Sequence, residues 1–336
     1  MRFTSIFLSC VVVTICATSV ENRSSDSLDE VLLFDAPAFQ DPANASNTLV
    51  SLQAFVYVKQ LDLSTLTSTL TAWTLGGITG SIETAVERLK LFTAVGVPGV
   101  SLSVGVGECS EQATLSATSS LPDLGLSMTN ASLGLCSGGD TYTGALLNAD
   151  DVVTMTIFPS GTNGYGVISD IDDTVKVSHV LDKLESIKTT LFDTPEPVTG
   201  MPDLYASLAQ TLNDPPFIYI TGSPYQLFPF LRDFFDDIFS QESRLSQVDR
   251  VHGMYSNMSF LTVGDSTQSD PEVYAEAYRK YGDFIRCIWI RRVDGANNTD
   301  ERFTTAFNGV PETKYRIYTD DEIPSLAQID VAGGSC

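Results

Sequence analysis

Histidine is scarce in this chain, which has only His179 and His252 among its 336 residues. Neither lies in a recognisable motif. A Ser-His-Asp hydrolase and a histidine phosphatase both need a positioned imidazole, so the sequence disfavours these two classes. Basic residues are also few, because 19 Lys and Arg stand against 42 Asp and Glu, for a net charge of −23. This balance argues against a nucleic acid partner and against tight binding to anionic membranes.

Long apolar runs are confined to the N-terminus. Met1-Arg2 is followed by an apolar run to Ile15 and by small residues at Ala17 and Ser19, which is the pattern of a secretory signal peptide. A membrane anchor is the alternative, but the run is short for a bilayer and a polar stretch follows it. We therefore expect a signal peptide over residues 1–19, no transmembrane segment, and a secreted, extracellular protein.

Cysteines are few, and those beyond the signal peptide lack the C-x-x-C spacing that zinc sites use. Cys10 and Cys16 lie in the expected signal peptide, which leaves an even number of four. In an oxidising compartment this predicts disulfides. The simplest of three connectivities joins Cys109 to Cys136 and Cys287 to Cys336. Sites of the form N-x-S/T, usable for glycosylation in a eukaryotic secretory route, occur at Asn22, Asn44, Asn130, Asn257 and Asn297.

The length and a change of pattern near residue 160 predict two domains. Residues 29–160 carry short alternating runs rich in Ser, Thr, Val and Gly, which predict a β-rich, sandwich-like antiparallel domain. Ser81 precedes apolar residues at helical spacing and predicts one helix, whose apolar stripe we assign to the core. Strands are expected at 49–58, 100–106, 113–118 and 152–158.

From Tyr165 onward, strand and helix patterns alternate, which predicts an α/β domain with a parallel sheet covered on both faces. This domain is expected over 164–322 and is followed by a tail over 323–336. Its strands are expected at 166–169, 217–221, 260–263 and 286–290, with helices at about 202–212, 226–238 and 271–280.

The most informative stretch is Gly166–Thr174, where an apolar strand ends in three carboxylates and a threonine. Ligands of open α/β sheets bind at this edge. Alternate positions share a side, so Asp170 and Asp172 can converge on one metal ion and one substrate while Asp173 points elsewhere. One carboxylate can attack phosphorus and the other can carry a proton. An EF-hand is excluded, because Val175 and Leu181 stand where it needs Gly and Glu; a solvated turn or helix N-cap is the simpler alternative.

The stretch Asp170–Thr174 resembles the first motif of the haloacid dehalogenase superfamily of phosphotransferases. Three further blocks follow in order at 196–205, 219–227 and 263–274. Together the four blocks are similar to the catalytic domain of the actin-patch-associated phosphatidate phosphatase family of fungi and bacteria, over about 164–293. The resemblance implies a haloacid dehalogenase-like Rossmannoid fold and a hydrolase of lipid metabolism that removes phosphate from phosphatidate.

The resemblance also implies roles for individual residues. Asp170 would be the nucleophile that forms an aspartyl-phosphate, and Asp172 the general acid and then the base. Thr221, with the backbone of Gly222, would bind a phosphoryl oxygen; a helix N-cap is the alternative for Thr221. The cofactor would be Mg²⁺, for which the ligand set is Asp170, Asp172, Asp265 and Asp270. Asp265 is the better candidate for the ion, and Asp270 for orienting the loop or a water.

The chain departs from the family pattern at one position. The family usually has a lysine before the last metal-binding strand, and the matching residue here is Arg244. Either Arg244 supplies the charge beside the phosphoryl group, or another cation does, or the enzyme is impaired. The other cations considered are Lys176, Lys183 and Arg232.

The sequence supports phosphate chemistry better than a lipid substrate. The dense aromatic run 228–239 must be partly core, although a few of its residues could line an acyl groove or a lip in transient contact with a membrane. A phosphatase of soluble phosphoesters and an exported, catalytically impaired binding protein are the alternative functions.

Overall fold

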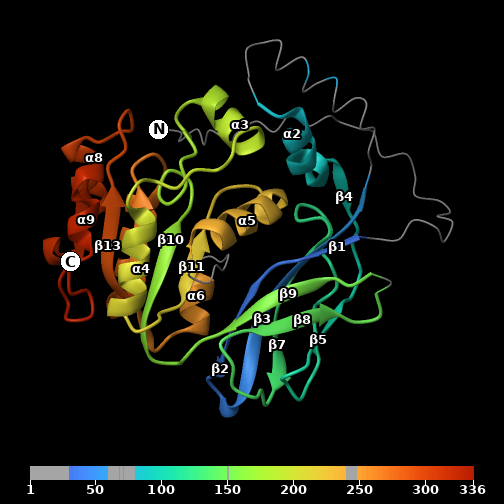
Figure 1. Cartoon of the computed structure of the whole chain (residues 1–336). Helices are drawn as coiled ribbons and strands as arrows, with labels where there is room; N and C mark the ends of the chain where they lie inside the picture. Colours follow the sequence, from blue (N-terminus) through green and yellow to red (C-terminus); the bar gives the residue numbers. More distant parts are fainter. Residues whose placement is uncertain (1–29, 60–67, 69–70, 72–79, 150, 240–247) are drawn as a thin grey trace.

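The computed structural model of the protein describes residues 30–59, 68, 71, 80–149, 151–239 and 248–336. The expected signal peptide, the glycosylation site at Asn22 and the candidate cation Arg244 lie outside these residues. The described strands form two sheets, one from the N-terminal half of the chain and one from the C-terminal half (Figure 1). The chain passes from the first to the second between Pro159 and Gly164.

The first sheet has nine strands, in the order β1-β3-β2-β9-β8-β5-β6, with β4 and β7 also paired to β3. All pairs are antiparallel except β2 with β9. The strands are β1 Glu30–Leu33, β2 Ala36–Asp41, β3 Asn44–Lys59, β4 Ala94–Gly96, β5 Ser103–Val106, β6 Ala113–Thr114, β7 Leu126–Gly134, β8 Tyr142–Leu146 and β9 Thr154–Pro159.

This sheet differs from the expected sandwich, because its strands are hydrogen-bonded into one curled sheet. The cause lies in β3, which is 16 residues long and has partners along both edges. Its first half pairs with β2 and its second half with β1 and β4, while β7 runs along both halves. The side chains enclosed by the curl form one apolar core that includes Val50, Leu52, Val104 and Ile157.

The second sheet is parallel, in the order β11-β10-β12-β13-β14. The structure confirms its first four strands and adds a fifth at the edge. They are β10 Gly164–Asp170, β11 Phe217–Ile220, β12 Met258–Asp265, β13 Ile285–Arg291 and β14 Tyr315–Tyr318. The helices of this half are α3 Lys183–Leu191, α4 Met201–Thr211, α5 Phe228–Ile238, α6 Val248–Met254, α7 Asp270–Tyr281, α8 Asp300–Ala306 and α9 Ile323–Leu326.

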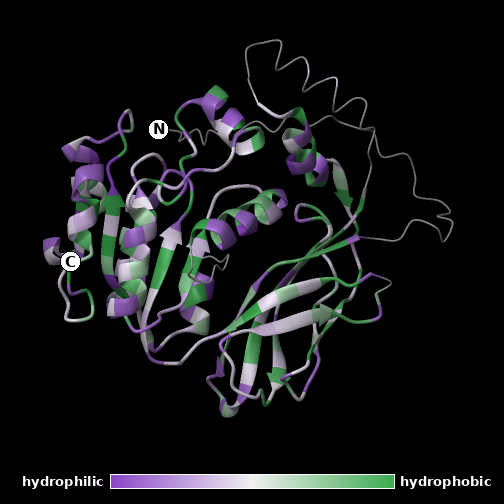
Figure 2. Ribbon diagram, in the orientation of Figure 1, coloured by the Kyte–Doolittle hydropathy of each residue, from purple (hydrophilic) through white to green (hydrophobic). Residues whose placement is uncertain are grey.

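Helices cover both faces of the parallel sheet. Val167 and Ile168, adjacent on β10, belong to two different core clusters because successive strand residues face opposite sides. The cluster that contains Val167 also contains side chains of α4, α5 and α9, and the cluster that contains Ile168 contains side chains of α6, α7 and α8. Figure 2 shows the hydrophobic colour concentrated in the strands of the two sheets.

The aromatic run on α5 is core, so the expectation that some of it lines an acyl groove is wrong. Six of its seven large side chains are buried: Phe228, Phe230, Leu231, Phe234, Phe235 and Phe239. The helix lies between the two halves of the molecule, which explains apolar residues on more than one face. Most of the run packs under the parallel sheet. Phe228 instead contacts Phe34 of the first half, with ring centroids 4.7 Å apart.

The helix expected after Ser81 is present as α2, Ile82–Leu89, with the Ser81 side chain accepting a hydrogen bond from the Thr84 N–H. Its buried Ala85 packs with Leu191 and Phe192 at the end of α3. The N-terminal half therefore supplies a helix to the same end of the molecule as α3 (Figure 1).

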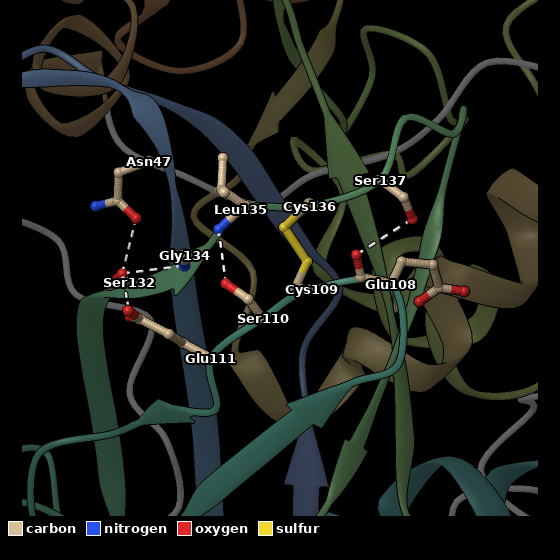
Figure 3. The surroundings of a disulfide bond; sticks show 10 residues. All are labelled: Asn47, Glu108, Cys109, Ser110, Glu111, Ser132, Gly134, Leu135, Cys136 and Ser137. Carbon is tan, nitrogen blue, oxygen red and sulfur yellow. Dashed lines mark hydrogen bonds between the residues drawn. A yellow bond between two sulfur atoms is a disulfide. The ribbon is translucent and has the colours of Figure 1, made fainter.

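Both disulfides have the expected connectivity. Cys109 pairs with Cys136 between two loops of the first sheet, where the Leu135 N–H also donates to Ser110 Oγ (Figure 3). Cys287, buried on β13, pairs with Cys336, the last residue. Among the described residues, no helix has the length and apolar character needed to cross a membrane. The described N-x-S/T asparagines, Asn44, Asn130, Asn257 and Asn297, are exposed.

Candidate active site

Asp170 is the last residue of β10, which lies between β11 and β12. The parallel register brings the C-terminal ends of these strands to one edge of the sheet. The Asp170 carboxylate is buried, and the Thr174 hydroxyl donates to its Oδ2 at 3.0 Å. The threonine of the D-x-D-x-T motif therefore orients the first aspartate of that motif.

Asp170, Asp265 and Asp270 come together at this edge, each offering one oxygen within 4.8 Å of the others. Asp265 ends β12, and Asp270 begins α7. The Asp265 N–H donates to Asp270 Oδ2 at 2.9 Å, so Asp270 also orients the loop between them. Gly264 permits this approach, because a Cβ there would lie 2.4 Å from Asp270 Oδ2.

Burial and mutual repulsion disfavour the ionised forms of these three carboxylates. Burial, then the charges of Asp270, Asp265 and Asp172, raises the pKa of Asp170 well above its usual range. Burial raises the pKa of Asp265 to about 6, and burial together with Asp265 raises the pKa of Asp270 to about 7. Asp265 Oδ2 is buried with no hydrogen-bond partner. A buried acceptor without a donor among like charges fits a site for a divalent cation with oxygen ligands.

The Asp172 side chain is not part of this group and has different surroundings. Three hydroxyls donate to it: Ser178 to Oδ1 at 2.6 Å, and Thr221 and Ser223 to Oδ2 at 3.0 and 2.7 Å. The Lys176 ammonium lies 3.6 Å from Oδ1. Burial raises the pKa of Asp172, but Lys176 and the three hydroxyls oppose it, and the pKa lies below its ordinary value. Asp172 is therefore ionised in this arrangement.

Thr221 and Ser223 come from the loop after β11. Thr221 Oγ1 accepts from the Ser223 N–H at 2.9 Å while it donates to Asp172. Gly222, between them, is exposed at the edge of the site. Sequence reasoning identified Thr221 and Gly222 but missed Ser223, although its place two residues after Thr221 in an otherwise apolar stretch was an available signal.

Asp173 is not part of the cluster of Asp170, Asp265 and Asp270, as its position in the motif predicts, and its side chain holds the following loop. Its backbone has a φ of 57°, and its side chain accepts hydrogen bonds from the N–H groups of Ser178, His179 and Val180. The Arg291 guanidinium, at the end of β13, donates to its carbonyl at 2.6 Å. This network fixes the loop that carries Lys176 and Ser178.

The loop from Asp265 to Asp270 is held by Arg302 of α8. Its guanidinium donates to the Ser266 carbonyl at 2.6 Å and to the Gln268 carbonyl. It also forms a paired contact with the Glu272 carboxylate at 3.0 and 3.1 Å. Arg302 thus positions the backbone of the loop, and sequence reasoning did not identify it.

The structure distinguishes among the three cations that the sequence offered as alternatives to Arg244. Lys183 is exposed at the first turn of α3. Arg232 pairs with Asp35 of the first half at 3.5 Å, away from the site. Lys176 is 1% exposed and donates to Ser178 Oγ at 2.5 Å in addition to its ion pair with Asp172. Of these three, only Lys176 contacts a candidate site residue.

Comparison with known proteins agrees with the position of this site. The family model of the catalytic domain of phosphatidate phosphatase APP1 matches residues 165–243 and 237–292. Phosphatidate phosphatase APP1 of Saccharomyces cerevisiae is 25% identical over 181 residues, which cover 46% of this chain and 31% of that protein. An uncharacterized protein of Schizosaccharomyces pombe, C29B5.04c, is 26% identical over 179 residues, 45% of this chain and 29% of its own length.

The chain spans about a third of the length of these curated relatives. The region matched by the family model begins at Tyr165 on β10 and ends just after β13. It includes all three clustered carboxylates and the loop with Thr221 and Ser223. The segment 165–292 of this chain is therefore similar to the catalytic domains of the phosphatidate phosphatase APP1 family.

Proposed function

We propose that the chain is a phosphomonoesterase that uses Asp170 as its nucleophile and depends on a divalent cation. The observation that carries the proposal is the different surroundings of two carboxylates two residues apart. Asp170 faces the buried Asp265 and the half-buried Asp270, and Asp172 faces three hydroxyls and a lysine. Phosphoryl transfer through an aspartate needs this division, because one carboxylate attacks while the other carries a proton.

Mg²⁺ is the proposed ion, held by Asp170, Asp265 and Asp270. Since the hydroxyls occupy the Asp172 side chain, Asp172 would contribute through its backbone carbonyl. When bound, the ion would keep Asp170 ionised and neutralise charge on the phosphate. The buried Asp265 Oδ2 that lacks a hydrogen-bond partner supports this assignment.

In the first step an Asp170 oxygen forms a bond to phosphorus, and the bond from phosphorus to the ester oxygen breaks. Asp172 gives its proton to the leaving alcohol oxygen. In the second step a water oxygen attacks phosphorus, Asp172 accepts the water proton, and the bond to Asp170 breaks with release of phosphate. Asp172 is ionised before substrate arrives, so the approach of an anionic phosphate must raise its pKa enough for it to bring a proton. The Gly222 backbone N–H and the Thr221 hydroxyl bind the phosphoryl oxygens, and the Thr221 hydroxyl turns from Asp172 to the phosphate when substrate binds.

The proposed substrate is phosphatidate or a lysophospholipid phosphate, because the family model that matches the chain is that of a phosphatidate phosphatase. The proposed location is extracellular, because the N-terminal sequence has the pattern of a signal peptide and the chain has two disulfides. The parallel sheet, with the nucleophile on a central strand, supports a haloacid dehalogenase-like fold. A soluble phosphoester is the second candidate substrate, because burial of the α5 aromatics removes the acyl groove that the sequence offered.

The test is phosphate release from a panel of phosphatidate, lysophosphatidate and soluble phosphoesters, with Mg²⁺ and with EDTA. We expect Mg²⁺-dependent release that is fastest with the lipid esters. Release from soluble esters alone would establish the second candidate. Absence of release from the whole panel would contradict the proposal and favour an exported binding protein.

A further inference from the structure

We propose that Lys176 is the cation that positions Asp172, and that it does so through the Ser178 hydroxyl. The inference rests on the proposed function and deepens it, because it identifies a residue on which the proton-carrying carboxylate depends. The family pattern suggested Arg244 as the cation of the site. We instead assign a cationic role to Lys176, which lies in the D-x-D-x-T loop, and its target is different. The target is the acid–base carboxylate Asp172, and the nucleophile Asp170 is oriented separately by Thr174.

The contacts form a short chain. The Lys176 ammonium donates to Ser178 Oγ at 2.5 Å, and Ser178 donates to Asp172 Oδ1 at 2.6 Å. The direct distance from Lys176 Nζ to Asp172 Oδ1 is 3.6 Å. Thr221 and Ser223 hold the other oxygen, Oδ2. Both oxygens of Asp172 are therefore fixed, one by the D-x-D-x-T loop and one by the loop after β11.

The burial of Lys176 shows that the pair is built into the fold. Lysine is almost never fully buried unless it is paired, because removing the ammonium from water costs several kcal/mol. Lys176 is 1% exposed, and its ion pair among the described residues is with Asp172. The ring of Phe230 lies beneath it, with Nζ 5.8 Å from the centroid, and Arg88 lies 4.1 Å from the same centroid. If Lys176 served packing alone, an apolar side chain of similar volume would stabilise the fold at least as well, without the free energy needed to remove an ammonium from water.

The charges explain why Asp172 needs this partner. Asp170, Asp265 and Asp270 lie on one side of the site and repel a fourth carboxylate. The charges of Arg291 and Arg302 act on Asp265 and Asp270, and these arginines form their ion pairs with Asp320 and Glu272. Lys176 is the described cation that balances Asp172 and draws it toward the loop with Thr221. Without Lys176, Asp172 keeps its hydroxyls but loses the charge that fixes its direction.

The experiment compares two esters that differ in their need for a general acid. An alkyl ester such as lysophosphatidate has a poor leaving group and needs a proton from Asp172, whereas p-nitrophenyl phosphate has a good one and does not. We expect Lys176→Met to lower kcat/KM about a hundredfold for the alkyl ester and less than about tenfold for the aryl ester. Asp172→Asn should show the same selective loss. The double variant should be no slower than Asp172→Asn, because both changes act on one group.

Ser178→Ala is a smaller structural change and leaves Lys176 in place. It should lower kcat/KM selectively for the alkyl ester, by a smaller factor than Lys176→Met. If Lys176→Met does not fold, Ser178→Ala tests the inference. Lys188→Met, on the surface of α3, is the matched control and should resemble the parent. Equal losses on both esters, or losses that add to that of Asp172→Asn, would overturn the inference while leaving the proposed function intact. A parent protein that hydrolyses neither ester would overturn the proposed function itself.

Discussion

At the scale of single residues, the site depends on carboxylates with opposite protonation preferences only a few residues apart. The pKa of Asp170 is raised by burial and by Asp270 and Asp265, whereas the pKa of Asp172 is lowered because Lys176 and three hydroxyls outweigh its burial. The D-x-D spacing alone could not predict this difference. It arises from Ser178, Thr221 and Ser223, which come from two loops that only the folded sheet brings together.

The Ser223 hydroxyl gives a first prediction. A hydrogen bond to a charged group is worth about 1.5–3 kcal/mol, so Ser223→Ala should slow turnover roughly tenfold to a hundredfold. Steady-state phosphate release measures the effect. Ser325→Ala, an exposed serine on α9, should retain the parent rate. Parent-like activity of Ser223→Ala would mean that Thr221 holds Asp172 unaided.

The clustered carboxylates give a second prediction, on stability against pH in EDTA. Asp265 and Asp270 have folded pKa values of about 6 and 7, above the ordinary value of 3.8. A raised folded pKa stabilises the protein fully below the unfolded pKa, and this contribution is lost as the pH rises through the folded pKa. It is on the order of 3 to 4 kcal/mol per carboxylate, because the two pKa values are raised by about 2 and about 3 and one pKa unit is about 1.4 kcal/mol. The melting temperature should therefore fall as the pH rises from about 4 to about 7.

Two comparisons check the source of that slope. Asp265→Asn should flatten it, because an amide does not titrate. Saturating Mg²⁺ should raise the melting temperature most at the higher pH, because a metal binds the ionised carboxylates. A melting temperature in EDTA that rises steadily over this range would show that the three carboxylates do not repel one another in the folded protein.

At the scale of elements, the sequence predicted the strongly patterned segments and missed weakly patterned ones such as α3 and β14. β10 to β13 and the helices α4, α5 and α7 were expected close to their observed positions, because buried parallel strands read as continuous apolar runs. β14 was missed because Arg316 interrupts its apolar residues and only Tyr318 of the strand is buried, unlike the equally short but apolar β11. The aromatic run of α5 was predicted as a helix, but its packing could not be read from the sequence, because the second surface it covers belongs to the other half of the chain.

Helix α8 provides the third prediction. Arg302 ties this helix to the carbonyls of Ser266 and Gln268, within the loop that carries Asp265 and Asp270. Residues that orient metal-binding groups cost roughly tenfold to a hundredfold in metal affinity when changed, so Arg302→Met should raise the Mg²⁺ concentration for half-maximal activity by that factor. Arg279→Met is the matched control, because Arg279 donates to the Ala306 and Asn308 carbonyls outside this loop. Equal Mg²⁺ requirements for the two variants would refute the role of Arg302.

At the scale of the whole molecule, the two sheets share their packing. Phe39 of β2 belongs to the core cluster of the parallel sheet, and its ring lies 5.9 Å from that of Tyr255. Phe55 of β3 lies 4.9 Å from Tyr225, two residues after Ser223. Arg250 of α6 donates to Ser51 Oγ on β3. The N-terminal half therefore supports the loop with Thr221, a role that its sequence gave no means to predict.

This shared packing predicts that the halves unfold together. Calorimetry of the full chain should give one transition, and Phe39→Ala should destabilise it by about 3–5 kcal/mol, the usual cost of removing a buried phenylalanine ring. Leu121→Ala, at an exposed leucine of the first half, should leave the transition unchanged. Two separated transitions, with Phe39→Ala shifting only one of them, would show that the halves are independent.

The central claim, that Asp170 transfers the phosphoryl group, is tested most directly by phosphate release from phosphatidate in Mg²⁺ by the parent chain and by Asp170→Asn. The amide fills the same volume but cannot form the acyl phosphate, so the account predicts a rate of phosphate release lower by several powers of ten. The melting profile of the variant should equal that of the parent in Mg²⁺-free buffer at acidic pH, where Asp170 is protonated. Unaltered phosphate release by a folded Asp170→Asn variant would contradict the account.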